Sequence, residues 1–154
     1  MSSGEFDRDT LFGQFREVRE FSEQLSSPLA TEDYVIQSMP DVSPTKWHLA
    51  HTSWFFEAFV LEKSDKKYKS LHPQYNYLFN SYYTLVGERH CRPKRGLISR
   101  PTVAEVYKYR DYVNKKIEGF FTKSSNKEFQ KHAPVIEIGI HHERQHQELM
   151  LTDI

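Results

Sequence analysis

The segment from residue 44 to residue 63 constrains the fold more than any other part of the sequence. Its large apolar positions are Trp47, Trp54, Ala58 and Leu61. Including His51 in this series gives steps of four, three, four and three residues, the spacing of one buried face of an α-helix. No segment has the sustained apolar–polar alternation that predicts a strand. The pattern predicts an all-α protein in which His51 points into the core.

Four other segments have helical spacing of apolar residues. They cover about 8–25, 73–86, 103–121 and 134–154. Thr102 and Glu105 match the capping box that starts a helix at the next residue. Short connections between long helices predict an antiparallel four-helix bundle. The stretch 88–100 is predicted to be an irregular, basic loop.

Composition excludes several classes of protein. Lys plus Arg is 21 and Asp plus Glu is 21, so zero net charge gives no electrostatic reason to expect nucleic acid or an acidic membrane as partner. Cys91 is the single cysteine, so an intrachain disulfide is excluded and a reducing compartment is indicated. Neither a spanning segment nor a signal peptide is recognisable. We therefore expect one cytoplasmic domain over residues 1–154.

The last predicted helix carries two histidines on its expected inner face. That face is defined by Val135, Ile138 and Leu149. Steps of four, four and three residues from Ile138 lead to His142, His146 and Leu149, so both histidines lie on the same face. Histidines one helical turn apart can bind the same metal ion, and His51 would supply a third nitrogen from another helix. Three protein ligands leave open positions, which is typical of a catalytic metal site.

Other interpretations of these histidines stay open. Metal-binding imidazoles need an acceptor for their second nitrogen, which Glu143, Gln145 or Glu148 could supply. Buried histidines satisfied by protein groups alone would instead indicate a metal-free interaction module. A glutamate directly after the first histidine also occurs in zinc proteases, so spacing does not exclude a protease.

His48 is the main alternative to His51 as the third ligand. It lies one turn earlier, on the same side of the helix as Thr52 and Phe55, away from the main apolar face. We therefore prefer His51.

Long stretches of the sequence resemble a known family. They are Gln37–Pro40, Ser43–Glu57, Tyr77–Tyr83, Arg95–Pro101 and His142–Ile154. Together they resemble the DinB-like N-terminal domain of the sulfoxide synthases of ergothioneine biosynthesis. The resemblance implies a DinB-like helical bundle and a non-haem iron(II) enzyme that uses dioxygen. The reaction would join a thiol, cysteine or γ-glutamylcysteine, to the imidazole C2 of N-α-trimethylhistidine.

The resemblance also implies roles for particular residues. The iron(II) ligands would be His51, His142 and His146, and nickel or zinc could replace iron in a purified sample. Gln145 would lie near the substrate imidazole. The carboxylate of the thiol substrate would be held by arginines of the basic loop, among which Arg89 and Arg92 match the family best by position and Arg95 is a further candidate. An ordinary solvated loop is the alternative for these arginines.

Members of this family are longer than this chain. They carry a C-terminal domain of the formylglycine-generating type, which supplies a catalytic tyrosine and parts of both substrate sites. Because the sequence ends at Ile154, we expect it to lack that domain and not to turn over alone. Two alternatives remain: a stand-alone DinB-like thiol-dependent transferase or isomerase with zinc or nickel, and the 5-histidylcysteine sulfoxide synthase of the ovothiol pathway.

Overall fold

The computed structural model describes residues 4–81 and 89–154, and all regular structure in these ranges is helical. The α-helices are α1 (Arg8–Ser26), α2 (Thr45–Phe56), α3 (Glu62–Ser64), α4 (Tyr75–Phe79), α5 (Val103–Lys123) and α6 (Asn126–Asp153). The π-helical stretch Glu57–Leu61 joins α2 to α3, so these segments form one continuous helix. Short 3-10 helices cover Thr31–Val35 and Arg92–Leu97. The all-α prediction is confirmed.

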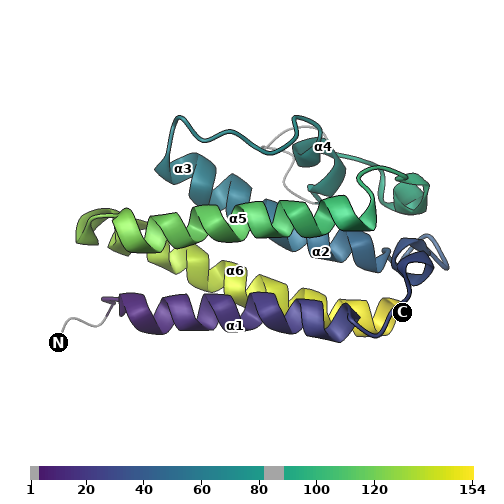
Figure 1. Ribbon diagram of the computed structural model, residues 1–154, viewed down its shortest axis with the longest axis horizontal. Coiled ribbons are helices and arrows are strands. Elements are labelled where there is room, and N and C mark those ends of the chain that lie inside the picture. Colours follow the sequence, from purple (N-terminus) through teal and green to yellow (C-terminus); the bar gives the residue numbers. More distant parts are fainter. Residues whose placement is uncertain (1–3, 82–88) are drawn as a thin grey trace.

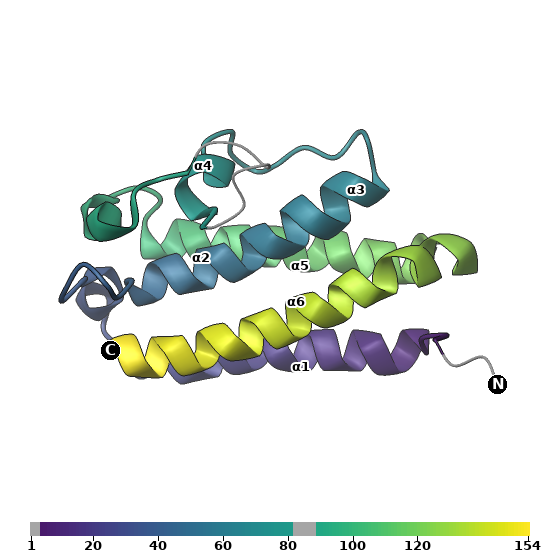
Figure 2. The same cartoon turned by 180° about the vertical axis from the view of Figure 1, so that it is seen from behind.

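Four long helical segments form the bundle. In Figure 1, α1 and α6 run in one direction, whereas α5 and the α2–α3 helix run in the other. Figure 2, the view from behind, shows α6 lying along α1. Helices α2 and α5 begin at the same end of the bundle and pack against each other, so they are parallel neighbours. The predicted helical bundle is therefore confirmed, with two helices in each direction.

Helix α2 lies at the centre of this bundle. All of its residues are buried, because α5 and α6 pack along it and α1 and α4 cover other parts. Trp47 and Trp54 of the predicted inner face are 2% and 0% exposed. His48 is also buried, at 3%, although the apolar pattern places it away from the main face. A helix that is covered on all sides lacks an amphipathic pattern, so the spacing of its apolar residues does not reveal every buried position.

Helix α6 differs from its prediction in its start and in its inner face. The Ser125 hydroxyl accepts a hydrogen bond from the Glu128 N–H at 3.1 Å, so the helix begins well before Pro134. Ile138 and Leu149 are 57% and 37% exposed, so the prediction that these two residues face the core is wrong, whereas His146 of the same predicted face is buried. The buried residues of α6 are Phe129, His132, Ala133, Ile136, Gly139, Ile140, Glu143, His146, Gln147 and Met150. Four of them are polar, so a search for apolar residues at helical spacing does not find this face.

The predicted helix over 73–86 is confirmed in part. Among its described residues, 73–81, Tyr75–Phe79 is helical, and Asn80 ends this helix in an extended conformation. Phe79 of this segment is fully buried, whereas residues 82–88 lie outside the described part of the chain.

Apart from α6, the predicted bounds of the long helices agree closely with the structure. Thr102 and Glu105, for example, form the expected capping box in front of α5. Among the described residues, no helix combines the length and apolar character needed to cross a membrane.

Candidate metal centre

Three histidines from two helices meet inside the bundle. His51 comes from α2, while His142 and His146 lie one turn apart on α6. One ring nitrogen from each lies within 4.8 Å of the others, and Nε2 of His51 is 3.1 Å from Nε2 of His142. These are the three histidines that the sequence predicts as ligands. Their arrangement could hold one metal ion between α2 and α6.

Burial keeps these imidazoles neutral. It lowers the pKa of His51 well below its ordinary value, with a further contribution from nearby His142. Burial likewise lowers the pKa of His142 to about 4 and strongly lowers the pKa of His146. Each ring therefore has a lone pair available near neutral pH, as metal binding requires.

Neighbouring groups fix the orientation of two of the rings. Nδ1 of His51 lies 2.5 Å from the carbonyl oxygen of Phe79, which can only accept a hydrogen bond. Nδ1 therefore carries the hydrogen, and Nε2 keeps the lone pair. The same ring stacks on Trp47 at 4.4 Å between centroids, and His142 stacks on Phe55 at 4.7 Å.

Among the described residues, no hydrogen bond joins the side chains of Glu143, Gln145 or Glu148 to these histidines. Nδ1 of His142 is buried and has no hydrogen-bond partner among the described residues. Glu148 and Gln145 are exposed, and the Glu143 carboxylate pairs with Arg19 and Arg110 in the core. The groups that contact the second nitrogens are the Phe79 carbonyl at His51 and the His48 ring at His146.

A cavity of about 160 Å³ opens beside the triad, lined by Arg92, Arg95 and Gln145 as well as the histidines. Arg95 is 3% exposed, and its guanidinium lies 3.5 Å from the centroid of Trp47. It donates hydrogen bonds to the hydroxyls of Ser43 at 2.8 Å and Ser81 at 3.2 Å. Its position is therefore fixed from three sides.

The other two predicted arginines are more exposed. Arg92 donates to the carbonyl oxygen of Asp41 at 2.6 Å and still borders the cavity. Arg89 donates to the carbonyl oxygen of Ser81 and does not line the cavity. The structure thus brings Arg92, Arg95 and Gln145 next to the triad and leaves Arg89 outside the cavity.

Comparison with known families agrees with this fold. A family model described as the DinB superfamily matches residues 14–150. The chain belongs to the DinB superfamily. Metal binding occurs in this superfamily, and the DinB fold here places the histidine triad in its core. No curated protein gives a significant match to the sequence.

A buried ionic cluster in this DinB domain was missed from the sequence. Glu143 is fully buried, with Oε1 2.9 Å from Nη1 of Arg19 and Oε2 3.0 Å from Nη2 of Arg110. The Ser22 hydroxyl also donates to Glu143 at 2.6 Å. Burial alone would raise the pKa of Glu143, but the two guanidinium groups lower it to about 2. The cluster joins α1, α5 and α6 at the residue that follows His142.

One signal could have revealed the cluster. Glu143 lies seven residues after Ile136 and three after Ile140, so it continues the true core face of α6. A charged residue on a core face needs an opposite charge, which directs attention to arginines on neighbouring helices.

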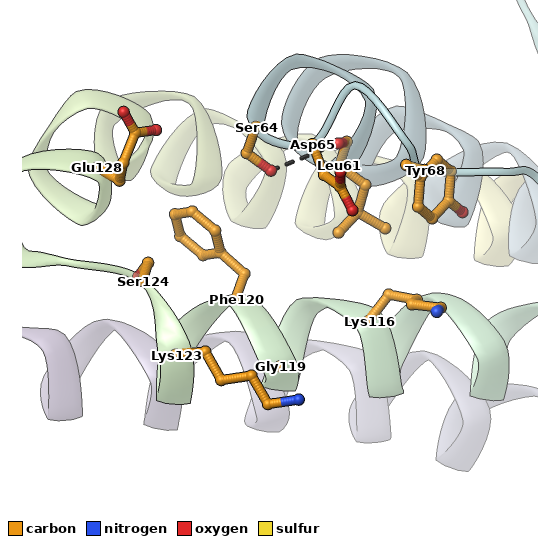
Figure 3. A pocket seen from close by; sticks show the side chains of 10 residues that line it. All are labelled: Leu61, Ser64, Asp65, Tyr68, Lys116, Gly119, Phe120, Lys123, Ser124 and Glu128. Atoms are coloured by element: carbon orange, nitrogen blue, oxygen red, sulfur yellow. Dashed lines mark hydrogen bonds between the residues drawn. The ribbon is translucent and has the colours of Figure 1, made fainter.

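A second pocket of the DinB domain lies toward the other end of the bundle, near α3 (Figure 3). Its volume is about 310 Å³, and its lining includes Tyr68, Lys116, Phe120 and Glu128. Within the described ranges, the histidine triad is the one group of His, Cys, Asp or Glu side chains close enough to hold a metal. The cavity of about 160 Å³ beside the triad is therefore the better candidate for the functional site.

Proposed function

We propose that this DinB domain is the iron(II)-binding domain of a sulfoxide synthase of ergothioneine biosynthesis. The enzyme would use dioxygen to join cysteine or γ-glutamylcysteine to the imidazole C2 of N-α-trimethylhistidine. The observation that carries the proposal is one cavity that combines a neutral histidine triad with Arg95 and Gln145. The sequence segments that resemble the family contribute all of these residues.

The donor set fits a divalent metal that reacts with small molecules. Three neutral imidazoles suit iron(II), nickel or zinc, and three protein ligands leave positions open for substrates. Bound iron(II) would supply the redox chemistry with dioxygen. The ligands would be His51, His142 and His146, of which His51 is oriented by the Phe79 carbonyl and its stacking on Trp47.

Arg95 would bind the carboxylate of the thiol substrate. Its guanidinium is a planar fork suited to two parallel hydrogen bonds with a carboxylate. Two serine hydroxyls and the Trp47 ring already hold it beside the triad, so little orientational freedom is lost when an anion binds. Arg92 would add a second positive charge at the rim, and Arg89 would act from outside the cavity.

Gln145 would contact the imidazole of trimethylhistidine, since it lines the cavity from the turn of α6 between the two histidines. A C-terminal domain of the formylglycine-generating type would supply the catalytic tyrosine and exclude water from the open side. Such exclusion and precise positioning are what a dioxygen-dependent reaction requires of the protein.

The test uses the protein encoded by the intact gene, loaded with iron(II) and supplied with dioxygen, trimethylhistidine and either thiol. We expect mass spectrometry to detect a sulfoxide bonded at imidazole C2, and His142→Ala to abolish it. A bond at C5 of histidine would indicate the ovothiol-type enzyme instead. Thiol transfer without dioxygen consumption, in a zinc- or nickel-loaded protein, would support the transferase or isomerase class and contradict the proposal.

A further inference from the structure

A line of hydrogen-bonded side chains leads from the end of α6 to the metal centre. The Asp153 carboxylate lies 2.7 Å from Nε2 of His48, and Nδ1 of His48 lies 2.9 Å from Nδ1 of His146. His48 is 3% exposed, so bulk water has little access to its ring. Figure 2 shows the end of α6 beside the start of α2, which brings the three residues together.

The chemistry of these groups determines where the hydrogen atoms lie. A carboxylate only accepts hydrogen bonds, so Nε2 of His48 carries a hydrogen. A neutral imidazole has one N–H group, so Nδ1 of His48 is an acceptor. The hydrogen between the two rings then belongs to Nδ1 of His146. The lone pair of His146 is left on Nε2.

We propose that Asp153 and His48 are positioning residues that set the tautomer of His146, so that its Nε2 lone pair is available to a divalent metal. This inference rests on the metal-binding part of the proposed function and extends it to two residues outside the triad. Without the carboxylate, His48 can place its hydrogen on Nδ1 and donate to His146. The hydrogen of His146 then moves to Nε2 and blocks coordination through that nitrogen.

A purely structural role for Asp153 makes a different prediction. The same carboxylate oxygen accepts a hydrogen bond from the backbone N–H of Ser43 at 3.0 Å, so it also connects the end of α6 to the residues before α2. If that connection were the whole role, loss of the carboxylate would lower the stability of the metal-free protein. The metal affinity of the folded protein would stay unchanged.

Metal titration separates the two roles. The metal-free chain is titrated with cobalt(II) in competition with a chelator, and its thermal unfolding is recorded without metal. We expect Asp153→Ala to bind cobalt(II) about 10- to 100-fold more weakly, the usual effect of removing a partner that orients a ligand. Asp153→Asn should bind as the wild type does, since the Ser43 N–H keeps the amide oxygen turned toward His48. Wild-type affinity in a folded Asp153→Ala protein would overturn the proposal.

Glu148→Ala is the matched control, because Glu148 is an exposed carboxylate on the same helix. It should leave cobalt(II) affinity unchanged, and a loss as large as that of Asp153→Ala would show a general charge effect and contradict the proposal.

A second measurement needs no metal and no variant. Long-range ¹H–¹⁵N correlation spectra of the metal-free wild type identify which nitrogen of each ring carries the hydrogen. We expect Nδ1–H in His146 and Nε2–H in His48. A hydrogen on Nε2 of His146 would contradict the proposal even if Asp153→Ala fails to fold. The tautomer is read separately from metal binding and sulfoxide formation, so failure of the proposed function is distinguishable from failure of this inference.

Discussion

Gly139 of α6 lies directly against Phe56 of α2. A β-carbon at Gly139 would be 2.5 Å from Cε1 of Phe56 and 3.1 Å from Cδ1 of Phe55. Real β-carbons do not approach other atoms as closely as the first distance, so the missing side chain lets the two helices come together. Because Gly139 precedes His142 by one turn, this close approach also places the α6 histidines next to His51.

Gly139→Ala should therefore destabilise the protein. Overpacking a core position costs about 1–3 kcal/mol, of which the better helix propensity of alanine offsets up to about 1 kcal/mol. Gly119→Ala is the matched control, since Gly119 is also helical and has nothing within 4 Å of an added β-carbon. It should stabilise by about 0.5–1 kcal/mol. Urea unfolding of both variants measures these effects, and equal stability of the two would contradict the close packing.

Loss of the Glu143 carboxylate should be more severe. Glu143→Gln leaves the guanidinium groups of Arg19 and Arg110 buried without their shared counter-charge. Removing one partner of a buried ion pair typically costs about 3–5 kcal/mol, and denaturant unfolding would measure it. Glu148→Gln, on an exposed position of the same helix, should change stability by less than about 0.5 kcal/mol. A similarly small effect of Glu143→Gln would show that the cluster does not stabilise the bundle.

The sequence predicts the parts of the site that depend on helical period. The four-residue spacing of His142 and His146 and the α2 series around His51 are local patterns, and the structure brings these three side chains together. The contacts of His48 and Glu143 depend on residues from other helices, such as Asp153 and Arg110. A search for helical spacing considers only apolar residues. It therefore assigns the wrong core face to a helix whose core face includes a charged residue paired with a residue far away in the sequence.

The start of α6 shows a similar limit. Pro134 suggests a helix start, because proline fits the first turn, yet Ser125 caps the helix earlier and the chain accepts proline in the interior. Packing of Phe129 and Ala133 into the core favours the longer helix. Such tertiary stabilisation cannot be read from local sequence preferences.

Glu57 should make stability depend on pH. Burial raises the pKa of this carboxyl, although hydrogen bonds from Tyr68, Tyr109 and Ser70 oppose the change. The folded protein then binds this proton more tightly than the unfolded chain, so this contribution to stability is complete below the ordinary glutamate pKa and is lost as pH rises through the raised pKa. Glu57→Gln lacks this titration.

The stability of Glu57→Gln relative to the wild type should therefore improve as pH rises from about 4 toward 7. Urea unfolding of both proteins at several pH values gives this difference and cancels the shared contribution of other titrating groups. A difference that stays constant, or moves the other way, would contradict the raised pKa.

Under the proposed function, Arg95 should control the affinity of the sulfoxide synthase for its thiol substrate. A hydrogen bond to a charged group contributes about 1.5–3 kcal/mol, so Arg95→Ala should raise the KM for the thiol about 10- to 100-fold and leave the metal content unchanged. Arg89→Ala should have a smaller effect, since Arg89 does not line the cavity. Steady-state kinetics at saturating trimethylhistidine measures both, and equal KM values for Arg95→Ala and the wild type would exclude this role.

The number of metal ions that each chain binds decides whether the three histidines form a metal centre. The metal-free chain is titrated anaerobically with iron(II) and, separately, with cobalt(II), and the bound metal is counted by elemental analysis after gel filtration. We expect one metal ion per chain in the wild type and in His141→Ala, because His141 is exposed outside the triad. We expect no stoichiometric binding in the folded double variant His142→Ala plus His146→Ala. One full equivalent of metal in that double variant would contradict the assignment of the centre.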